Sequence, residues 1–420
     1  MITLAYILSG LSLLMSALFL IKLKFPSFVF FLKLLAVVLS PYWAIMGAAG
    51  AVMGWVYQAL WAIPMGIVGA GWMTWYVWRC TRDHNKFEKA FGADWSDQIR
   101  PEQARNMVKK RWTWALKMKA SPEPAWERDV AFWTIPDTDR ELLCDIWRPA
   151  NGDVSGLAFI YFHGAGWFAL DKDFAKTTRP FFRHLVAQGH TVMDVSYRLC
   201  PEVDIYGMVG DVKRAIAWMK ANASRYGVDP EKIVLGGGST GAHIALLAGY
   251  APQHPELTPE DVKSADLSVC GIVSYYGPID LVEGYHRYTV IQLSKNPPSV
   301  PIGKRLEPNE IPRHVGRLDL LLGGRPEDIP DTYQLASPAT HVHPGCPPTL
   351  LFQGDRDVLV PVEPTCALYT KLVESGVPAI NVVFPWTEHA FDLLFPQISP
   401  PAQSALCDVD RFLALLLNKD

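Results

Sequence analysis

The sequence predicts an α/β protein whose mainly parallel β-sheet carries helices on both faces and follows an α-helical transmembrane region. After residue 125, eight short segments rich in β-branched and aromatic residues alternate with helical patterns, as in parallel sheets. Between Met1 and Trp78, by contrast, the only charged side chains are Lys22, Lys24 and Lys33. The first fifth of the chain is therefore suited to a different solvent from the rest.

The N-terminal region is predicted to cross a membrane. Residues 2–21 carry no charge and would form a helix of about 30 Å, the thickness of the hydrocarbon layer. They lack the basic start of a signal peptide, so we interpret them as a retained span. Residues 34–78 are also uncharged and long enough for two further spans, separated near Gly54. We therefore expect a membrane region at 1–80 with about three spans.

The basic residues predict an orientation. Three spans place the loop from Lys22 to Lys33 on the same side as Arg79 and Arg82, and the positive-inside rule makes that side cytosolic. The expectation is a multi-pass protein of the endoplasmic reticulum with its large domain in the cytosol. The alternative is a shallow hairpin or interfacial anchor at 34–78, which lowers the number of spans and weakens the orientation.

The remaining chain divides into a linker and one large domain. Residues 81–125 are charged and mostly helical in pattern, which indicates a membrane-proximal linker. The domain at 126–420 contains the strand candidates 128–135, 142–147, 157–162, 191–197, 232–237, 271–277, 348–354 and 379–384. A Pro-rich stretch at about 282–342 interrupts this alternation, and we interpret it as a cap insertion over a site.

Composition excludes several classes of function. The formal net charge of −3 gives no electrostatic support for a nucleic-acid partner. The seven cysteines are far apart and form no C-x-x-C pair, which argues against a disulfide scaffold and a zinc module. His341 and His343 could suggest a metal site, but surface or structural roles are the simpler interpretation. We therefore expect neither a metal nor a cofactor.

A serine stands where a strand must become a helix. Residues 237–241, Gly-Gly-Ser-Thr-Gly, fit G-x-S-x-G between the strand candidate 232–237 and the apolar helical pattern that follows. Glycines permit the tight turn, and backbone N–H groups at the helix start favour developing negative charge. Ser239 is therefore the candidate nucleophile.

A serine hydroxyl needs a base and an orienting acid, and its oxyanion needs N–H donors. The glycine-rich run from His163 to Trp167 directly follows the strand candidate 157–162 and offers such donors. Asp355 and Asp357 end a later strand candidate, and His389 follows the last one. The order Ser, Asp, His is that of the α/β-hydrolase arrangement, with either aspartate as the acid.

Five motifs together carry a family resemblance. "FHGAGW", "YRLCPE", "GGGSTGAH", "GDRDVLVP" and "EHAF" resemble, in order and spacing, the hormone-sensitive-lipase branch of the α/β hydrolases, including arylacetamide-deacetylase-like and feruloyl-esterase-like relatives. The resemblance extends from about Trp126 to the C-terminus. It implies an α/β-hydrolase fold with an eight-stranded mostly parallel sheet, and the activity of a serine esterase.

The resemblance also implies roles for single residues. It makes Ser239 the nucleophile and His389 the general base, and it favours Asp357 over Asp355 because the family acid commonly stands three residues after the glycine. The oxyanion hole would be formed by the backbone amides of Ala165, Gly166 and Thr240. His163 and Gly164 would support the loop that carries the first two. Ala165 departs from the family, which usually has glycine there, so its methyl group narrows the acyl side. Cys200 replaces a usual alanine.

We therefore expect a membrane-anchored serine hydrolase that cleaves a lipophilic ester through an acyl-enzyme. A lipophilic substrate, such as an acetylated sterol, terpenoid or other secondary metabolite, partitions into the bilayer and meets a tethered domain at high local concentration. The expected partners are this small ester and membrane lipid. One alternative is an acyltransferase or lactone-forming enzyme with the same triad; another is a non-catalytic ligand-binding protein, which predicts a broken triad.

Overall fold

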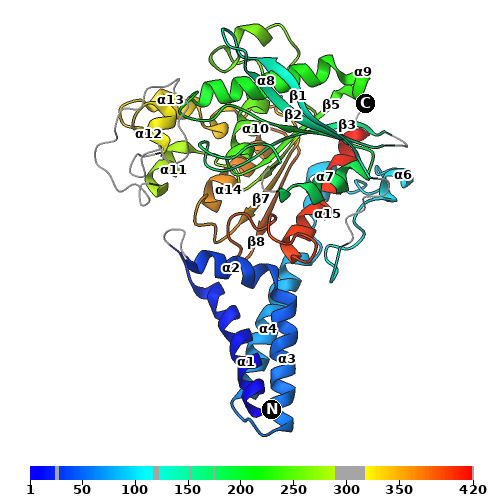
Figure 1. The fold of residues 1–420 in the computed structure, drawn as a ribbon, viewed down its shortest axis with the longest axis vertical. Helices are drawn as coiled ribbons and strands as arrows, with labels where there is room; N and C mark the ends of the chain where they lie inside the picture. Colours follow the sequence, from blue (N-terminus) through cyan, green and yellow to red (C-terminus); the bar gives the residue numbers. More distant parts are fainter. Residues whose placement is uncertain (24–27, 117–122, 151–153, 174–175, 289–316, 419–420) are drawn as a thin grey trace.

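An eight-stranded sheet in the order β1-β2-β4-β3-β5-β6-β7-β8 lies at the centre of the large domain (Figure 1). The computed structural model describes residues 1–23, 28–116, 123–150, 154–173, 176–288 and 317–418. β2 pairs antiparallel with β1 and β4, and the other neighbours are parallel. The strands are β1 (Ala125–Thr134), β2 (Glu141–Arg148), β3 (Gly156–Phe162), β4 (Thr191–Val195), β5 (Val228–Gly238), β6 (Gly271–Tyr275), β7 (Thr349–Gly354) and β8 (Ala379–Phe384). The predicted mostly parallel sheet of eight strands is confirmed.

Helices cover both faces of this sheet. Successive residues of β3 point to opposite cores: Phe159 and Tyr161 pack with Phe182, whereas Ile160 and Phe162 pack with residues of the other face. Burial on both faces explains why the strands read as nearly continuous apolar runs. One face carries α7 (Arg179–Val186) and α15 (Pro400–Leu417); the other carries α8 (Ile205–Ala221), α9 (Ala223–Tyr226), α10 (Thr240–Tyr250), η3 (Pro255–Leu257), η4 (Glu260–Val262) and α14 (Val362–Glu374).

The N-terminal helices form a bundle that projects from the large domain (Figure 1). The segments are α1 (Ile2–Ala17), η1 (Leu18–Leu20), α2 (Phe28–Val38), α3 (Ser40–Val56) and α4 (Ala62–Thr81). By length and composition one helix, Ile2–Leu20, could cross a membrane, or up to two if the pair α2 and α3, bent by 78°, is one span. Among the described residues this is fewer than the three predicted spans, because α2 and α3 form one bent pair and α4, although 20 residues long, is not apolar enough to count.

Small and hydroxylated residues fill the interior of this bundle. A Cβ atom on Gly66 would lie 2.3 Å from the carbonyl oxygen of Gly47, and one on Gly50 would lie 2.4 Å from Ser9 Oγ. The helix backbones can approach this closely only because side chains are missing at the contact. The exterior is the reverse, since large apolar side chains point outward there, including Trp55, Leu60 and Trp61 with exposures of 71 to 75%. This bundle therefore presents an apolar surface and encloses a more polar interior.

The linker is less helical than predicted. In its described part, residues 81–116 and 123–125, the helices that follow α4 are α5 (Lys86–Phe91) and α6 (Pro101–Ala104), and residues 105–116 have none. The backbone donors of this stretch bond to α15 and the loop before it: Val108 N–H to Asp410 at 2.6 Å, Thr113 N–H to Gln403 at 2.7 Å and Leu116 N–H to Gln397 O at 2.8 Å. Tertiary acceptors have replaced the i−4 carbonyls that a helix would have used, so the helical interpretation of this stretch was wrong.

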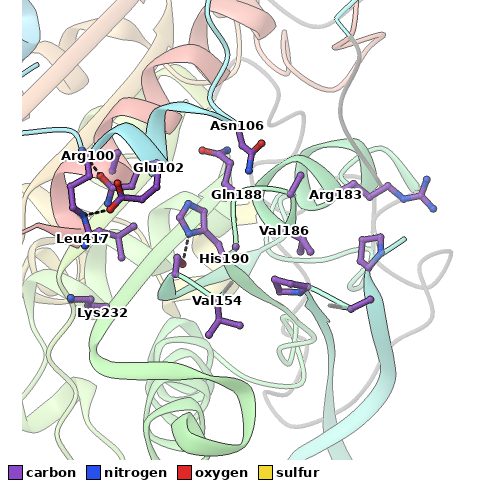
Figure 2. A pocket seen from close by; sticks show the side chains of 18 residues that line it. Arg100, Glu102, Asn106, Val154, Arg183, Val186, Gln188, His190, Lys232 and Leu417 are labelled. Atoms are coloured by element: carbon purple, nitrogen blue, oxygen red, sulfur yellow. Dashed lines mark hydrogen bonds and ion pairs between the residues drawn. The ribbon is translucent and has the colours of Figure 1, made fainter. Parts of the chain in front are cut away.

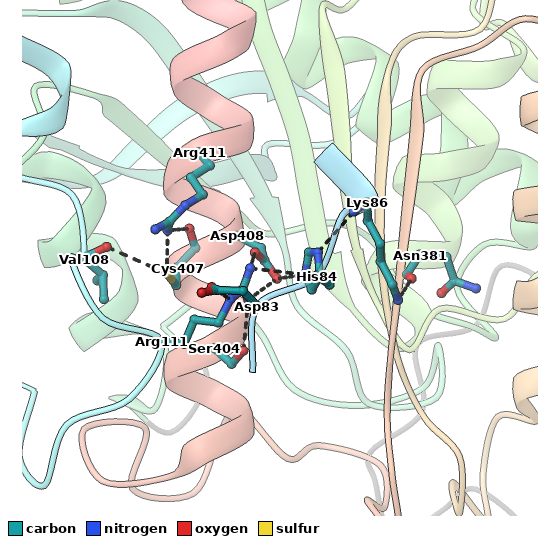
Figure 3. A network of polar contacts seen from close by, with 10 residues as sticks. All are labelled: Asp83, His84, Lys86, Val108, Arg111, Asn381, Ser404, Cys407, Asp408 and Arg411. Carbon is teal, nitrogen blue, oxygen red and sulfur yellow. Dashed lines mark hydrogen bonds and ion pairs between the residues drawn. The ribbon is translucent and has the colours of Figure 1, made fainter. Parts of the chain in front are cut away.

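A polar network fastens the linker to α15 (Figure 3). Asp408 is fully buried and bonds Arg111 at 2.7 Å and His84 at 3.1 Å. Burial raises the pKa of Asp408, but the hydrogen bond from His84 and the charge of Arg111 more than offset this and hold it below its usual range. The linker is thus bound along the surface of the large domain. The division at residues 80 and 125 stays a prediction.

The expected cap lies between β6 and β7. Its described part contains α11 (Leu281–Tyr288), α12 (Arg317–Leu322), α13 (Pro330–Leu335) and η6 (Pro338–His341), which gather at one side of the domain (Figure 1). Residues 289–316 of the expected cap and Lys24 of the basic loop lie outside the described residues. The function of this segment as a cap remains a prediction.

Candidate active site

Ser239 occupies the turn that joins β5 to α10. Its backbone has φ 55° and ψ −123°, in the positive-φ region that residues other than glycine rarely adopt. The turn is held from both sides, because Ser239 N–H donates to Tyr275 O at 2.8 Å and His243 N–H donates to Ser239 O at 3.0 Å. A strained serine at the first turn of a helix is the geometry of a nucleophile elbow.

The outer glycines of G-x-S-x-G are required by the neighbouring strand. A Cβ atom on Gly241 would lie 2.0 Å from the carbonyl oxygen of Phe162, and one on Gly237 would lie 2.6 Å from the same atom. Phe162 is the last residue of β3, so the end of this strand presses directly on the turn. Any side chain at either glycine would push the turn away from the sheet.

The glycine-rich loop after β3 lies against the same turn. A Cβ atom on Gly164 would lie 2.8 Å from Gly238 O and 3.1 Å from Ser239 Cβ. Thr240, the first residue of α10, continues the chain directly after the serine. The structure therefore brings the predicted loop, the serine and the start of α10 together at the carboxyl edge of the sheet.

Two features hold the loop in shape. The backbone of Ala165 has φ 112° and that of Gly166 φ 69°, so an alanine occupies a conformation that favours glycine. His163 is buried, its Nδ1 lies 2.8 Å from Gly164 O, and its carbonyl accepts from the hydroxyl of Tyr197 at 2.8 Å. Burial lowers the pKa of His163 despite that bond, so the ring is neutral and Nδ1 is the donor.

His389 and Asp357 form a buried pair after β8 and β7. Nδ1 of His389 lies 2.7 Å from Asp357 Oδ2, and the other carboxylate oxygen accepts the N–H groups of Leu359 and Val360, each at 2.8 Å. Such bonds fix the carboxylate and keep the proton on Nδ1, which leaves Nε2 as the basic nitrogen. Asp355, the alternative acid, is more exposed and lies beside Arg356.

Tyr276 connects the serine turn to His389, and the sequence did not reveal it. Its ring centroid lies 4.3 Å from that of His389, and a Cβ atom on Gly238 would lie 3.3 Å from its hydroxyl. The hydroxyl donates to Asp392. Burial raises the pKa of Asp392 to about 6, although the bond from Tyr276 opposes this rise. The only sequence signal was the position of Tyr276 near the end of the strand candidate 271–277.

A second missed contact joins the N-terminal helices to the histidine loop. Lys33 lies in α2, and its ammonium group forms an ion pair with Glu388, both side chains being fully buried. The sequence had placed Lys33 in a basic loop between two spans, which is wrong. A lone lysine in an apolar helix needs a counter-ion, and that lone charge was the available signal.

Other polar features of the described residues lie apart from Ser239. His341 and His343 bond the carbonyl oxygens of Leu335 and Tyr250, and the described residues contain no group of three potential metal ligands. A cavity of about 630 Å³ (Figure 2) reaches Ser155 and His190, just before β3 and β4. It therefore opens at the amino edge of the sheet, whereas open α/β sheets build their sites at the carboxyl edge.

Known proteins match more than half of this chain. The BD-FAE family matches residues 144–372, a range that holds Ser239 and Asp357 but ends before His389. "Probable carboxylic ester hydrolase LipM" of Mycobacterium tuberculosis is 32% identical over 273 residues, 64% of this chain and 57% of LipM. "Esterase LipQ" of the same bacterium is 27% identical over 341 residues, 80% of this chain and 74% of LipQ. This chain thus spans little more than half of LipM.

A solved structure gives the same picture of the fold. The propionate-bound esterase Est2 of Thermogutta terrifontis is 25% identical and superposes with a TM-score of 0.52. The match covers 70% of this chain and 96% of Est2.

Proposed function

The chain belongs to the BD-FAE family of α/β hydrolases, and from this membership and the geometry above we propose that it is a carboxylic ester hydrolase. One observation carries the proposal: the buried bond between His389 and Asp357 lies at the same edge of the sheet as the strained Ser239. The names of LipM and LipQ support the same reaction class.

The proposed reaction proceeds through an acyl-enzyme. Ser239 Oγ attacks the ester carbonyl while Nε2 of His389 takes its proton, and Asp357 stabilises the imidazolium that forms. The tetrahedral intermediate collapses, and His389 returns the proton to the departing alcohol. A water molecule then gives a proton to His389 and attacks the acyl group. His389 returns that proton to Ser239 Oγ as the acid leaves, which restores the free enzyme.

Backbone amides would stabilise the negative charge of each tetrahedral intermediate. We assign this role to the N–H groups of Ala165, Gly166 and Thr240, because the loop and the start of α10 flank Ser239. Preorganised donors of this kind contribute about 10² to 10³ in kcat each. The bonds of His163 to Gly164 and Tyr197 hold the loop for that purpose.

We further propose a membrane anchor and a lipophilic ester substrate. The apolar exterior and small-residue interior of the helix bundle suit a bilayer. At the end of α4, Arg79 lies 5.2 Å from the ring of Trp75 and Arg82 5.3 Å from that of Trp78, a pairing typical of the membrane interface. An acetylated sterol, terpenoid or similar metabolite held in the bilayer would reach the tethered domain, and the segment 282–342 would shape its pocket.

The substitution Ser239→Ala tests the catalytic assignment. Losing the nucleophile is expected to lower kcat on short acyl esters by about 10⁴-fold or more while the protein stays folded. Turnover is followed on p-nitrophenyl acetate, and folding by circular dichroism. Ser224→Ala, an exposed serine of α9, is the matched control and should behave as wild type. Full turnover in the Ser239→Ala protein would refute the assignment.

Two further measurements test the finer proposals. Alkaline carbonate should leave the full chain in the membrane pellet, and its release into the supernatant would refute the anchor. Product analysis with added alcohols and amines distinguishes hydrolysis from acyl transfer. Acyl products on the added acceptor, in place of free acid, would replace the hydrolase proposal with a transferase.

A further inference from the structure

The helix α2 reaches the histidine loop through one buried ion pair. Lys33 Nζ bonds Glu388 and also donates to the carbonyl oxygen of Ile21 at 2.9 Å. Neither side chain is exposed. Because Glu388 immediately precedes His389, the N-terminal helices hold the residue next to the proposed base.

Glu388 also holds the turn of the proposed acid. Its Oε2 accepts from the N–H of Val358 at 3.1 Å, and Val358 follows Asp357 directly. One carboxylate therefore joins α2, the His389 loop and the Asp357 turn. The two loops have little room to shift, since a Cβ atom on Gly354 would lie 2.2 Å from Thr387 O.

The two residues before Glu388 also contact the N-terminal helices. The hydroxyl of Tyr76 in α4 lies 3.0 Å from Thr387 Oγ1. The ring of Trp386 lies 4.5 Å from that of Trp75 and 6.3 Å from that of Phe19, measured between centroids. Residues 386–388 thus rest on three N-terminal elements, η1, α2 and α4, before the chain reaches His389.

The charges around Glu388 show what the lysine does. Burial raises the pKa of Glu388, the hydrogen bond and charge of Lys33 oppose that rise, and the nearby charge of Asp357 adds to it. Lys33 also acts on Asp355, which lies near Arg356 and Arg79. Without Lys33, a buried and unpaired carboxylate would lie beside the Asp357–His389 pair, which is unfavourable unless the loops rearrange.

We propose that Lys33 is a positioning residue for the proposed esterase: through Glu388 it fixes the position of His389 relative to Asp357. The N-terminal helices are then part of the catalytic architecture as well as an anchor. The inference rests on the proposed function and adds to it. An anchor alone would need no buried contact with the catalytic loops.

The test compares three variants of the full chain in detergent micelles, with p-nitrophenyl butyrate as substrate. Lys33→Met should lower kcat on the order of 10- to 100-fold with little change in KM, because small displacements of a catalytic base are this costly. The double variant Lys33→Met/Glu388→Gln has no unpaired buried charge, and its amide oxygen can still accept from Val358. Its kcat should be higher than that of Lys33→Met but remain severalfold below that of the wild type.

Lys213→Met is the matched control. Lys213 of α8 is equally buried and bonds Ala251 O at 2.6 Å and Thr258 Oγ1 at 2.9 Å, away from the histidine loop. It should lower the melting temperature and leave kcat unchanged.

The outcomes separate the two proposals. Wild-type kcat in Lys33→Met or in the double variant would overturn the positioning role. If Lys33→Met fails to fold, the double variant decides alone, because it carries no unpaired charge. A wild-type protein without turnover would instead refute the esterase proposal itself.

Discussion

The conformation of Ser239 depends on contacts made by its neighbours. The carbonyl oxygen of Phe162 leaves no room for a side chain at Gly237 or Gly241. The two glycines therefore allow the sharp turn at Ser239 to pack against the end of β3. Residues of this kind could be predicted from the sequence because each motif is local and follows a strand. Tyr276, Glu388 and Lys33 could not, because their partners are far away in the chain; Lys33 and Glu388 are 355 positions apart.

Ala165 gives a prediction about strain. Its φ of 112° costs an alanine about 1 to 2 kcal/mol, whereas glycine loses about 0.4 to 1 kcal/mol through the greater freedom of the unfolded chain. Ala165→Gly should therefore stabilise the protein by up to about 1 kcal/mol and raise turnover of longer acyl chains relative to acetyl. Thermal unfolding and a chain-length series measure both effects.

Ala169→Gly is the control for this substitution, because Ala169 is not among the residues with positive φ. It should destabilise the protein. If both substitutions destabilise equally, Ala165 is not strained.

Asp392 gives a prediction about pH. Its folded pKa of about 6 lies above the ordinary value of 3.8, so the folded state holds a proton that the unfolded state releases between these two values. The contribution of Asp392 to stability is therefore lost as the pH rises from about 4 to 6. Asp392→Asn should make the stability of the protein fall less steeply over that window in urea titrations. An unchanged slope would contradict the raised pKa.

At the scale of elements, the sheet was predictable and the helices around it were less so. Buried parallel strands have a strong apolar signature, and all eight were found. The linker at 105–116 has a helical pattern, but side chains of α15 take its backbone donors. α2 and α3 meet at a bend of 78°, with Pro41 in the first turn of α3. The contact of Lys33 in α2 with Glu388 is long-range, so no local pattern reveals it.

The bundle gives a prediction that compares two glycines of one helix. Gly66→Ala should force α3 and α4 apart and destabilise the bundle by about 1 to 3 kcal/mol, because the new methyl group would meet Gly47 O at 2.3 Å. Gly71→Ala meets nothing within 4 Å and should be neutral or stabilising. Thermal unfolding in micelles, followed by circular dichroism, compares them. Equal melting temperatures would contradict the close packing.

At the scale of the whole molecule, the N-terminal helices and the large domain share one core. Phe19, Met73 and Tyr76 belong to the same buried cluster as Phe352, Phe384 and Phe412. The charge pattern of the sequence suits the N-terminal helices to an apolar environment and the large domain to water. It could not show that the two regions pack together. The N-terminal helices, the linker and the large domain are therefore best treated as one folded unit.

The central claim is that Ser239 is the activated nucleophile of this unit. Labelling of the full chain in native membranes with a fluorophosphonate, followed by peptide mass spectrometry, tests it most directly. We expect one adduct, on Ser239, that is lost in Ser239→Ala and strongly reduced in His389→Ala. An adduct on another residue, or undiminished labelling of the Ser239→Ala protein, would contradict it.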